Sequence, residues 1–223
     1  MEKTPAPDLA LYGHPFSSYT WKALIALYAS ELPFDFRIVD ADHPEHAELV
    51  GSAGPAGKFP VLKDGDNVIF EASAIIDYLA VHHVEHIQLI PLQSDASIGV
   101  RMIDRVFDNY VMANTQDVVN EYLRDRENPD MARVEEARAR LEKAYAWLEG
   151  WLQYYPVVGQ VTLVECAAAP ALFYADWVHP ISGAYPRLRQ WRAHLVALPP
   201  VARCIEDARP YRRFFPLGAP DRD

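Results

Sequence analysis

Cysteine, basic charge and long apolar runs are all scarce in this 223-residue chain, and each shortage excludes a class of protein. Two cysteines, Cys166 and Cys204, are too few for a disulfide scaffold or a cysteine-based structural zinc site. No stretch approaches the roughly 20 apolar residues that cross a bilayer, and the charged, proline-containing residues 1–20 cannot form the apolar core of a signal peptide. We therefore expect a reduced, cytosolic protein.

Acidic residues outnumber basic ones by 31 to 21, and the excess lies early in the chain. Residues 1–85 contain 13 acidic and 5 basic residues, whereas residues 86–223 contain 18 and 16. This charge would repel a nucleic-acid backbone or an anionic membrane surface, so neither is expected as a partner. Half of the residues are apolar (50%), which is enough for a sizeable buried core.

The first part of the chain carries alternating signals for strands and helices. Period-two alternation indicates strands, apolar side chains at helical spacing indicate helices, and Asp64-Gly65 between two apolar runs is typical of a hairpin turn. This order predicts one mixed sheet with helices packed on it. The expected elements are strand 9–12, helix 19–29, strand 34–38, a short helix at 43–50, hairpin strands 60–63 and 67–70, and a helix from Ala72.

After about residue 90 the strand signals disappear, and apolar residues recur only at helical spacing. Residues 162–175 are almost wholly apolar, which places that helix inside a bundle. Its opening, Thr162-Leu163-Val164-Glu165, fits a capping box. We therefore expect an α+β domain at 1–84, a linker at 85–95 and an all-helical domain at 96–223. The predicted helices of the second domain cover 98–111, 134–152, 162–175, 186–195 and 200–208.

The turn between the first strand and the first helix contains two hydroxyl residues, Ser17 and Ser18. Serine is a preferred N-cap residue, so either side chain could simply satisfy a free helix amide. Alternatively, a hydroxyl at the positive end of a helix could stabilise a bound anion or thiolate. The glycine-rich fingerprints of nucleotide sites are absent from this turn.

Two later turns and one histidine cluster are further candidates. The sequence Lys58-Phe59-Pro60 enters a strand, where proline is ordinary, although a cis bond would turn the Phe59 backbone toward a peptide-like ligand. Glu71 opens a helix, where it either complements the helix dipole or holds a ligand ammonium. The cluster His82, His83 and His86 includes an i, i+4 pair, but no acid or cysteine completes a metal set, so no metal is expected.

Taken in order, these turns resemble those of the glutathione transferase family. The resemblance lies in LYGHPFS at residues 11–17, GKFPVL at 57–62, FEASAI at 70–75 and VTLVECAAAP at 161–170. The first turn is closest to the serine-type classes, phi above all, with some likeness to zeta around Ser17-Ser18-Tyr19. The family implies a thioredoxin-like N-terminal domain, a helical-bundle C-terminal domain, and a cytosolic homodimer that serves detoxification.

The resemblance also implies roles for individual residues. Ser17 would donate to the sulfur of glutathione, and a cis Pro60 would let the Phe59 backbone pair with its cysteinyl part. Lys58 would reach the glycine end, while Glu71 and Ala72 would hold the γ-glutamyl end. A hydrophobic electrophile would lie between the domains. The residues expected to line its pocket are Phe16, Phe107, Tyr110 and Val111, of which the last three also form an apolar helix stripe.

Departures from the family pattern leave three hypotheses open. Ala72 stands where the family commonly has serine, and Ser73 follows one place too late. The main hypothesis is an enzyme that conjugates glutathione to a hydrophobic electrophile. A non-catalytic binding protein is favoured by Ala72 and by the acidic first half, and a glutathione-dependent isomerase or dehalogenase would use the same thiolate. Tyr19 replaces the zeta-type cysteine, which weakens the isomerase hypothesis.

Overall fold

The structure is a computed structural model that describes residues 9–83, 88–156 and 159–223. Four strands form one sheet in the order β2-β1-β3-β4, in which β1 pairs parallel with β2 and antiparallel with β3. β3 and β4 form the hairpin that Asp64-Gly65 predicts. The strands are β1 (Leu9–Gly13), β2 (Asp35–Ile38), β3 (Val61–Asp64) and β4 (Asn67–Phe70).

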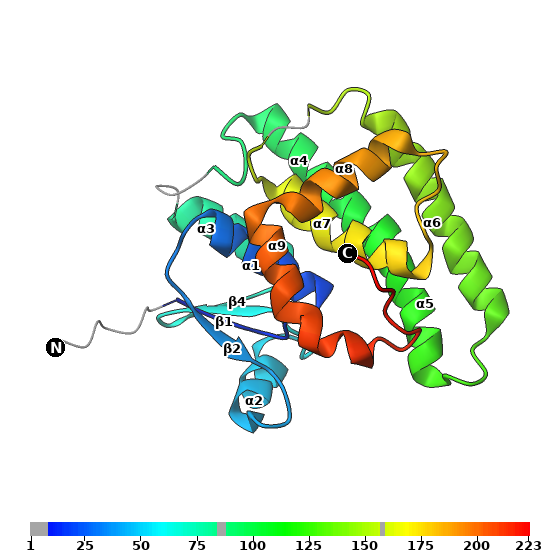
Figure 1. Cartoon of the computed structure of the whole chain (residues 1–223). Helices are drawn as coiled ribbons and strands as arrows, with labels where there is room; N and C mark the ends of the chain where they lie inside the picture. The colour runs from blue at the N-terminus through cyan, green and yellow to red at the C-terminus, as the bar shows by residue number, and fades with distance from the viewer. Residues whose placement is uncertain (1–8, 84–87, 157–158) are drawn as a thin grey trace.

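Period-two alternation along β1 decides which helices cover each face of the sheet. Leu11 is fully buried in the main core with α1 and α3, whereas Tyr12 faces the opposite side and clusters with Val50 of α2. Figure 1 accordingly shows α1 and α3 between the sheet and the helical half, with α2 on the outer side. The helices of this half are α1 (Ser18–Ala29), α2 (Pro44–Ala53) and α3 (Ala72–His82).

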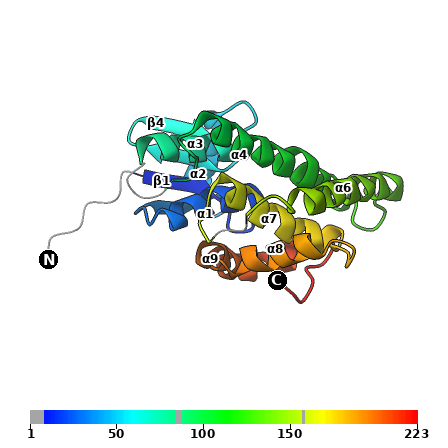
Figure 2. The ribbon, with the colours of Figure 1, turned by 90° about the horizontal axis from the view of Figure 1, so that it is seen from above.

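The rest of the described chain is helical, as predicted. α7 lies at the centre of this half with all its residues buried, and Thr162 and Glu165 form the expected capping box at its start. Figures 1 and 2 show α6 at the end of the molecule farthest from the sheet. The elements are α4 (Ser94–Val106), a π-helix η1 (Phe107–Met112), α5 (Ala113–Arg124), α6 (Met131–Trp151), α7 (Leu163–Val178), α8 (Pro186–Ala197), α9 (Pro199–Ala208) and a 3₁₀ helix η2 (Arg209–Phe214).

The predicted helix 98–111 is part of a longer run. α4, η1 and α5 follow one another without a break from Ser94 to Arg124, with one π-helical stretch in the middle. α4 begins just before the expected start of the second domain at residue 96. Residue 84 of the expected first domain and residues 85–87 of the expected linker 85–95 lie outside the described residues, so the domain boundaries stay a prediction. In the described part of the chain, no helix is both long and apolar enough to cross a membrane.

One buried ionic cluster joins the two halves of the molecule. Lys22 of α1 is 1% exposed, and its Nζ lies 2.5 Å from Asp104 Oδ1 and 2.7 Å from Asp108 Oδ2. The contact with Asp104 is an ion pair by distance, but its angles do not make a hydrogen bond. Nζ also donates to Ser73 Oγ at 2.9 Å, and Ser73 Oγ donates to Asp104 Oδ2 at 2.9 Å. The cluster therefore fixes α1, α3 and α4 relative to one another.

Candidate functional site

Ser17 is the N-cap of α1, and its hydroxyl still has a proton to donate. Its Oγ accepts a hydrogen bond from the Thr20 amide at 3.2 Å. A hydroxyl has one donor besides its acceptor lone pairs, so the cap leaves the O–H available to a ligand. The first turn of α1 contains no acidic residue that would offset the positive end of the helix dipole. Capping and anion stabilisation are therefore compatible at Ser17.

The turn that presents Ser17 is held tightly from both halves of the molecule. A Cβ at Gly13 would lie 2.5 Å from Thr20 Cγ2, so only glycine allows the first turn of α1 to sit this close to β1. The Trp21 indole donates to the Pro15 carbonyl at 2.6 Å. From α7, the Tyr174 hydroxyl donates to the Phe16 carbonyl at 3.0 Å. These contacts fix the position of the serine before any ligand arrives.

The peptide bond between Phe59 and Pro60 is cis, as predicted. Gly57, with φ of 54°, lies in the left-handed region and turns the chain into this segment. Pro60 is buried, Phe59 is half-buried, and Lys58 is exposed.

Glu71 immediately precedes α3 and has an unusual backbone conformation. Its φ is 71°, a left-handed value that is uncommon for a residue with a side chain and that often marks a functional constraint. Glu71 is exposed, while Ala72 at the start of α3 is 5% exposed. The first amides of a helix have no partner within the helix, so this end offers donors to an anion beside the Glu71 carboxylate.

A cavity of about 800 Å³ lies between the two halves, and it contains part of the predicted site. Phe16, Ser17, Lys58 and Phe59 line one wall. Glu71 and Ala72 do not line it. The other walls come from α5, α7 and the C-terminal segment, none of which the sequence pattern had indicated. Those additional lining residues include Met112, Thr115, Gln116, Val119, Asn120, Leu123, Tyr174, Phe214, Phe215 and Pro216.

Three residues predicted to line the electrophile pocket are elsewhere. Phe107 and Val111 are fully buried in the core, where the Phe107 ring lies 5.8 Å from that of Trp191. Tyr110 is 59% exposed and lies on a different surface. The family resemblance suggested these residues, and the apolar stripe that they share supported the alternative of a core position, which Phe107 and Val111 have. The cavity instead meets the next turns of the same helical run, which begin at Met112.

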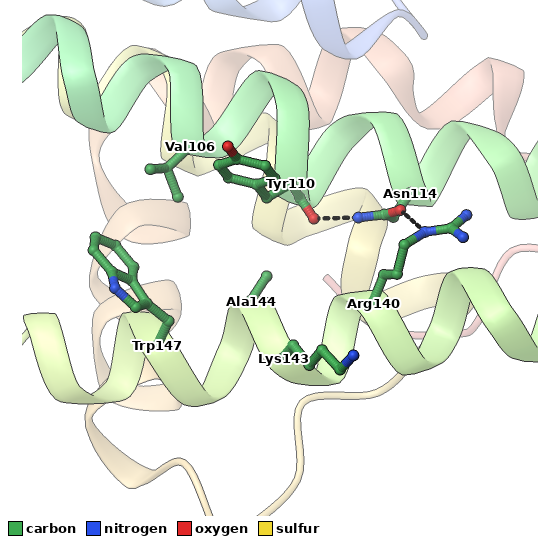
Figure 3. Close-up of a pocket in the computed structure, with 7 residues that line it drawn as sticks. All are labelled: Val106, Tyr110, Asn114, Arg140, Lys143, Ala144 and Trp147. Carbon is green, nitrogen blue, oxygen red and sulfur yellow. Dashed lines mark hydrogen bonds between the residues drawn. The ribbon is translucent and has the colours of Figure 1, made fainter.

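Tyr110 lines a second pocket of about 460 Å³, between the α4–α5 run and α6 (Figure 3). Trp147 and Ala144 of α6 face Val106 and Tyr110 across it. At one end, Arg140 Nε donates to Asn114 Oδ1 at 2.6 Å, and Asn114 Nδ2 donates to the Tyr110 carbonyl at 2.6 Å. The pocket is therefore apolar at one end and closed by a polar bridge at the other.

The two cysteines, His82 and His83 are not among the residues that line the cavity. Cys166 and Cys204 are buried, and burial raises the pKa of both thiols well above the ordinary value, so both are inert structural residues. Among residues 9–83, 88–156 and 159–223, no three His, Cys, Asp or Glu side chains group as a metal site. His83 contacts Asp64 at 3.3 Å, and His86 lies outside the described residues.

Comparison with known proteins agrees with this geometry. Residues 11–86 match the family model described as "Glutathione S-transferase, N-terminal domain", and residues 131–194 match "Glutathione S-transferase, C-terminal domain". Glutathione S-transferase PARB of Nicotiana tabacum is 26% identical over 89% of this chain and 97% of its own. A probable maleylacetoacetate isomerase of Vibrio cholerae is 27% identical over 91% and 98%.

A solved structure supports the same assignment at the level of the fold. The glutathione S-transferase of Methylobacillus flagellatus, with GSH bound, superposes with a TM-score of 0.76 at 22% identity, over 88% of this chain and 98% of its own. The mixed four-stranded sheet followed by a helical half, together with both domain matches, leads to one conclusion. The chain belongs to the cytosolic glutathione S-transferase family.

Proposed function

We propose that this protein is an enzyme that conjugates glutathione to a hydrophobic electrophile. The observation that carries the proposal is the free Ser17 proton at the N-terminus of α1, on the wall of a large cavity between the halves. A free cysteine thiol has a pKa of about 8.5, so little thiolate exists at neutral pH without such help. The hydroxyl and the helix dipole both favour the thiolate of a bound thiol.

In the proposed complex, glutathione extends from Ser17 toward the start of α3. The Phe59 backbone pairs with the cysteinyl part, and Lys58 reaches the glycine carboxylate. Glu71 holds the ammonium of the γ-glutamyl group, while the free amides at Ala72 hold its carboxylate. The structure of the M. flagellatus relative, which contains GSH, supports glutathione as the ligand.

The reaction that we propose needs no metal. The thiolate sulfur forms a bond to an electrophilic carbon, and the displaced electron pair leaves with a departing group. On an activated double bond, the pair instead moves to a neighbouring atom, which then takes a proton. The wall formed by the end of η1 and by α5 combines apolar Met112, Val119 and Leu123 with polar Gln116 and Asn120. Such a wall suits an electrophile with an apolar body and at least one polar group.

Product analysis tests this function directly. The protein would be incubated with reduced glutathione and a panel of aryl halides, epoxides and activated alkenes, and the products identified by mass spectrometry. A glutathione adduct that requires the protein supports conjugation. Isomerisation of a maleyl substrate without net adduct would favour the isomerase alternative, which the similarity to the V. cholerae protein supports.

Cytosolic location stays a prediction from composition.

Changing Ala72 to Ser is expected to tighten glutathione binding several-fold. The buried Ala72 leaves the helix amide available but offers no hydroxyl. One hydrogen bond to a charged group contributes about 1.5–3 kcal/mol, and partial solvation reduces that toward a factor of ten or less. Isothermal titration calorimetry measures the change, and turnover at saturating glutathione should stay nearly constant. If neither protein binds glutathione, the non-catalytic alternative becomes the better one.

We also propose that the protein forms a homodimer through α4 and α6. Several large apolar side chains of α4, η1 and α6 are exposed: Ile98 at 65%, Met102 at 56%, Tyr110 at 59% and Trp147 at 48%, of which the last two also line the second pocket. Such a patch on a monomer indicates a protein contact. Sedimentation velocity at micromolar concentration should show a dimer, and Trp147→Glu should shift it to monomer. A native chain that sediments as a monomer contradicts the proposal.

A further inference from the structure

Tyr19 lies on α1, which borders the cavity and also packs against α3. It lies in the first turn of α1 and lines the cavity beside Ser17 and Ser18. Lys22 follows one turn later on the same helix face, and its amine contacts Ser73 Oγ at 2.9 Å. Tyr19 is therefore on the face of α1 that Lys22 turns toward α3, one turn closer to the cavity than Lys22.

The Tyr19 hydroxyl is an available hydrogen-bond donor. Within the part of the chain that the structure describes, it forms no hydrogen bond with another residue. Burial, with the charges of Asp108, Glu71 and Asp104, raises the pKa of Tyr19 to about 12. The group therefore stays protonated at neutral pH and can donate to an acceptor.

The start of α3 lacks a hydroxyl that could turn to a ligand. Position 72 is alanine, and the next hydroxyl, on Ser73, is 5% exposed. Ser73 Oγ accepts from Lys22 and donates to Asp104, both at 2.9 Å. Its hydrogen-bonding capacity is thus committed to the buried cluster. The Tyr19 hydroxyl, on α1, can supply the hydrogen-bond donor that alanine at position 72 lacks.

We propose that the Tyr19 hydroxyl donates a hydrogen bond to the γ-glutamyl carboxylate of glutathione, in place of the hydroxyl that Ala72 lacks. The inference rests on the proposed function, because it assumes that glutathione is the ligand. It makes Tyr19 a substrate-binding residue distinct from Ser17, which acts at the sulfur. It also explains how this chain can hold the γ-glutamyl group with alanine at position 72.

A two-by-two set of variants tests the proposal by calorimetry with reduced glutathione. Tyr19→Phe should weaken binding by about tenfold, the size expected for one lost hydrogen bond to a carboxylate. Ala72→Ser should recover most of that loss, and it should gain more in the Tyr19→Phe background than in the native chain. Tyr154→Phe is the matched control, because Tyr154 is 85% exposed and does not line the cavity. It should leave the affinity unchanged.

A glutathione analogue separates this role from a general effect on the pocket. γ-Aminobutyryl-cysteinylglycine lacks only the γ-glutamyl carboxylate, so Tyr19→Phe should bind it as well as the native chain does. In kinetics, Tyr19→Phe should raise KM for glutathione and leave kcat unchanged. The proposal is overturned, while the proposed function stands, if Tyr19→Phe leaves the affinity for glutathione unchanged. It is also overturned if the variant loses affinity equally for both peptides, or if it raises the pKa of the bound thiol. Absence of glutathione binding by the native chain and by Ala72→Ser overturns both.

Discussion

Replacing Lys22 by methionine should lower the free energy of unfolding by about 3–5 kcal/mol, the range measured when one partner of a buried ion pair is removed. Lys22 and Asp104 are each 1% exposed, and Asp108 is mostly buried, so water cannot replace the lost charge. Methionine fills most of the space of the lysine stem. The loss would therefore come from two uncompensated carboxylates rather than from a cavity. Urea unfolding followed by circular dichroism measures the change.

The destabilisation should depend on pH in a defined direction. Burial raises the pKa of Asp108 above its ordinary value even with Lys22 present. An acid whose pKa is higher in the folded state binds protons more tightly there, so protonation favours the fold. Without Lys22 this pKa should rise further, and Lys22→Met should recover stability as the pH falls from neutral toward the range in which Asp108 protonates. A loss of equal size at every pH would contradict this mechanism.

Arg105 provides the matched control. Its side chain is 58% exposed, and its Nη1 lies 3.5 Å from Asp104 Oδ2 and 3.8 Å from Asp108 Oδ2. Water screens this exposed guanidinium, and Lys22 still neutralises the carboxylates when it is removed, so Arg105→Met should cost only about 1 kcal/mol. If Lys22→Met and Arg105→Met lower the free energy of unfolding by similar amounts, burial of the lysine is not the cause of the destabilisation. The cluster also holds α1 against the α4–α5 run, whose later turns line the cavity, so Lys22→Met should weaken ligand binding there.

Much of the fold could be predicted because its signals are local. Period-two alternation, the Asp64-Gly65 turn and the capping box at Thr162 each depend on a few neighbouring residues. Lys22 gave no such signal. It stands in a helix of mostly apolar neighbours, and one of its partners, Asp108, is 86 positions away. Only tertiary structure shows why a lysine is buried there.

The cavity wall was harder to predict than the turns. The family resemblance places the pocket on this helix but does not say which side chains reach it, and the apolar stripe shared by Phe107 and Val111 is the property that places a residue in the core. Gln116 and Asn120 line the cavity but carry no apolar signal. In addition, the π-helical stretch at 107–112 changes the angular register of the run, so spacing counted at 3.6 residues a turn misplaces the side chains of α5.

Ser17→Ala should slow conjugation roughly fiftyfold at about pH 6.5 and less than about twofold at about pH 9. These values hold if the Ser17 hydroxyl alone lowers the thiol pKa by about two units from its usual 8.5, which corresponds to about 2.7 kcal/mol; any share contributed by the helix dipole, which the substitution leaves in place, reduces the expected loss. At about pH 6.5, well below the thiol pKa of the variant, the loss of the donor reduces the reactive thiolate fraction. At about pH 9, above the thiol pKa of both the native chain and the variant, the thiol is mostly ionised in either protein. Rates under saturating glutathione, measured across this pH range, give the effect.

The N-cap role of Ser17 must be separated from the donor role, because one substitution removes both. Loss of the cap to the Thr20 amide costs about 1 kcal/mol of stability at any pH. Thiolate stabilisation, in contrast, appears as a shift of the pH–rate profile. A uniform rate loss that parallels the loss of stability would leave Ser17 as a cap alone.

Ser18→Ala is the matched control, since Ser18 lies one residue further along the same cavity wall and Ser17, not Ser18, is the N-cap. It should leave both the pH–rate profile and the ultraviolet absorbance of the bound thiolate unchanged. If Ser18→Ala alone shifts the profile, the donor is Ser18. If only Ser17→Ala shifts it, the hydroxyl that caps α1 through its oxygen also activates the thiol through its proton, and one side chain serves the helix and the reaction together.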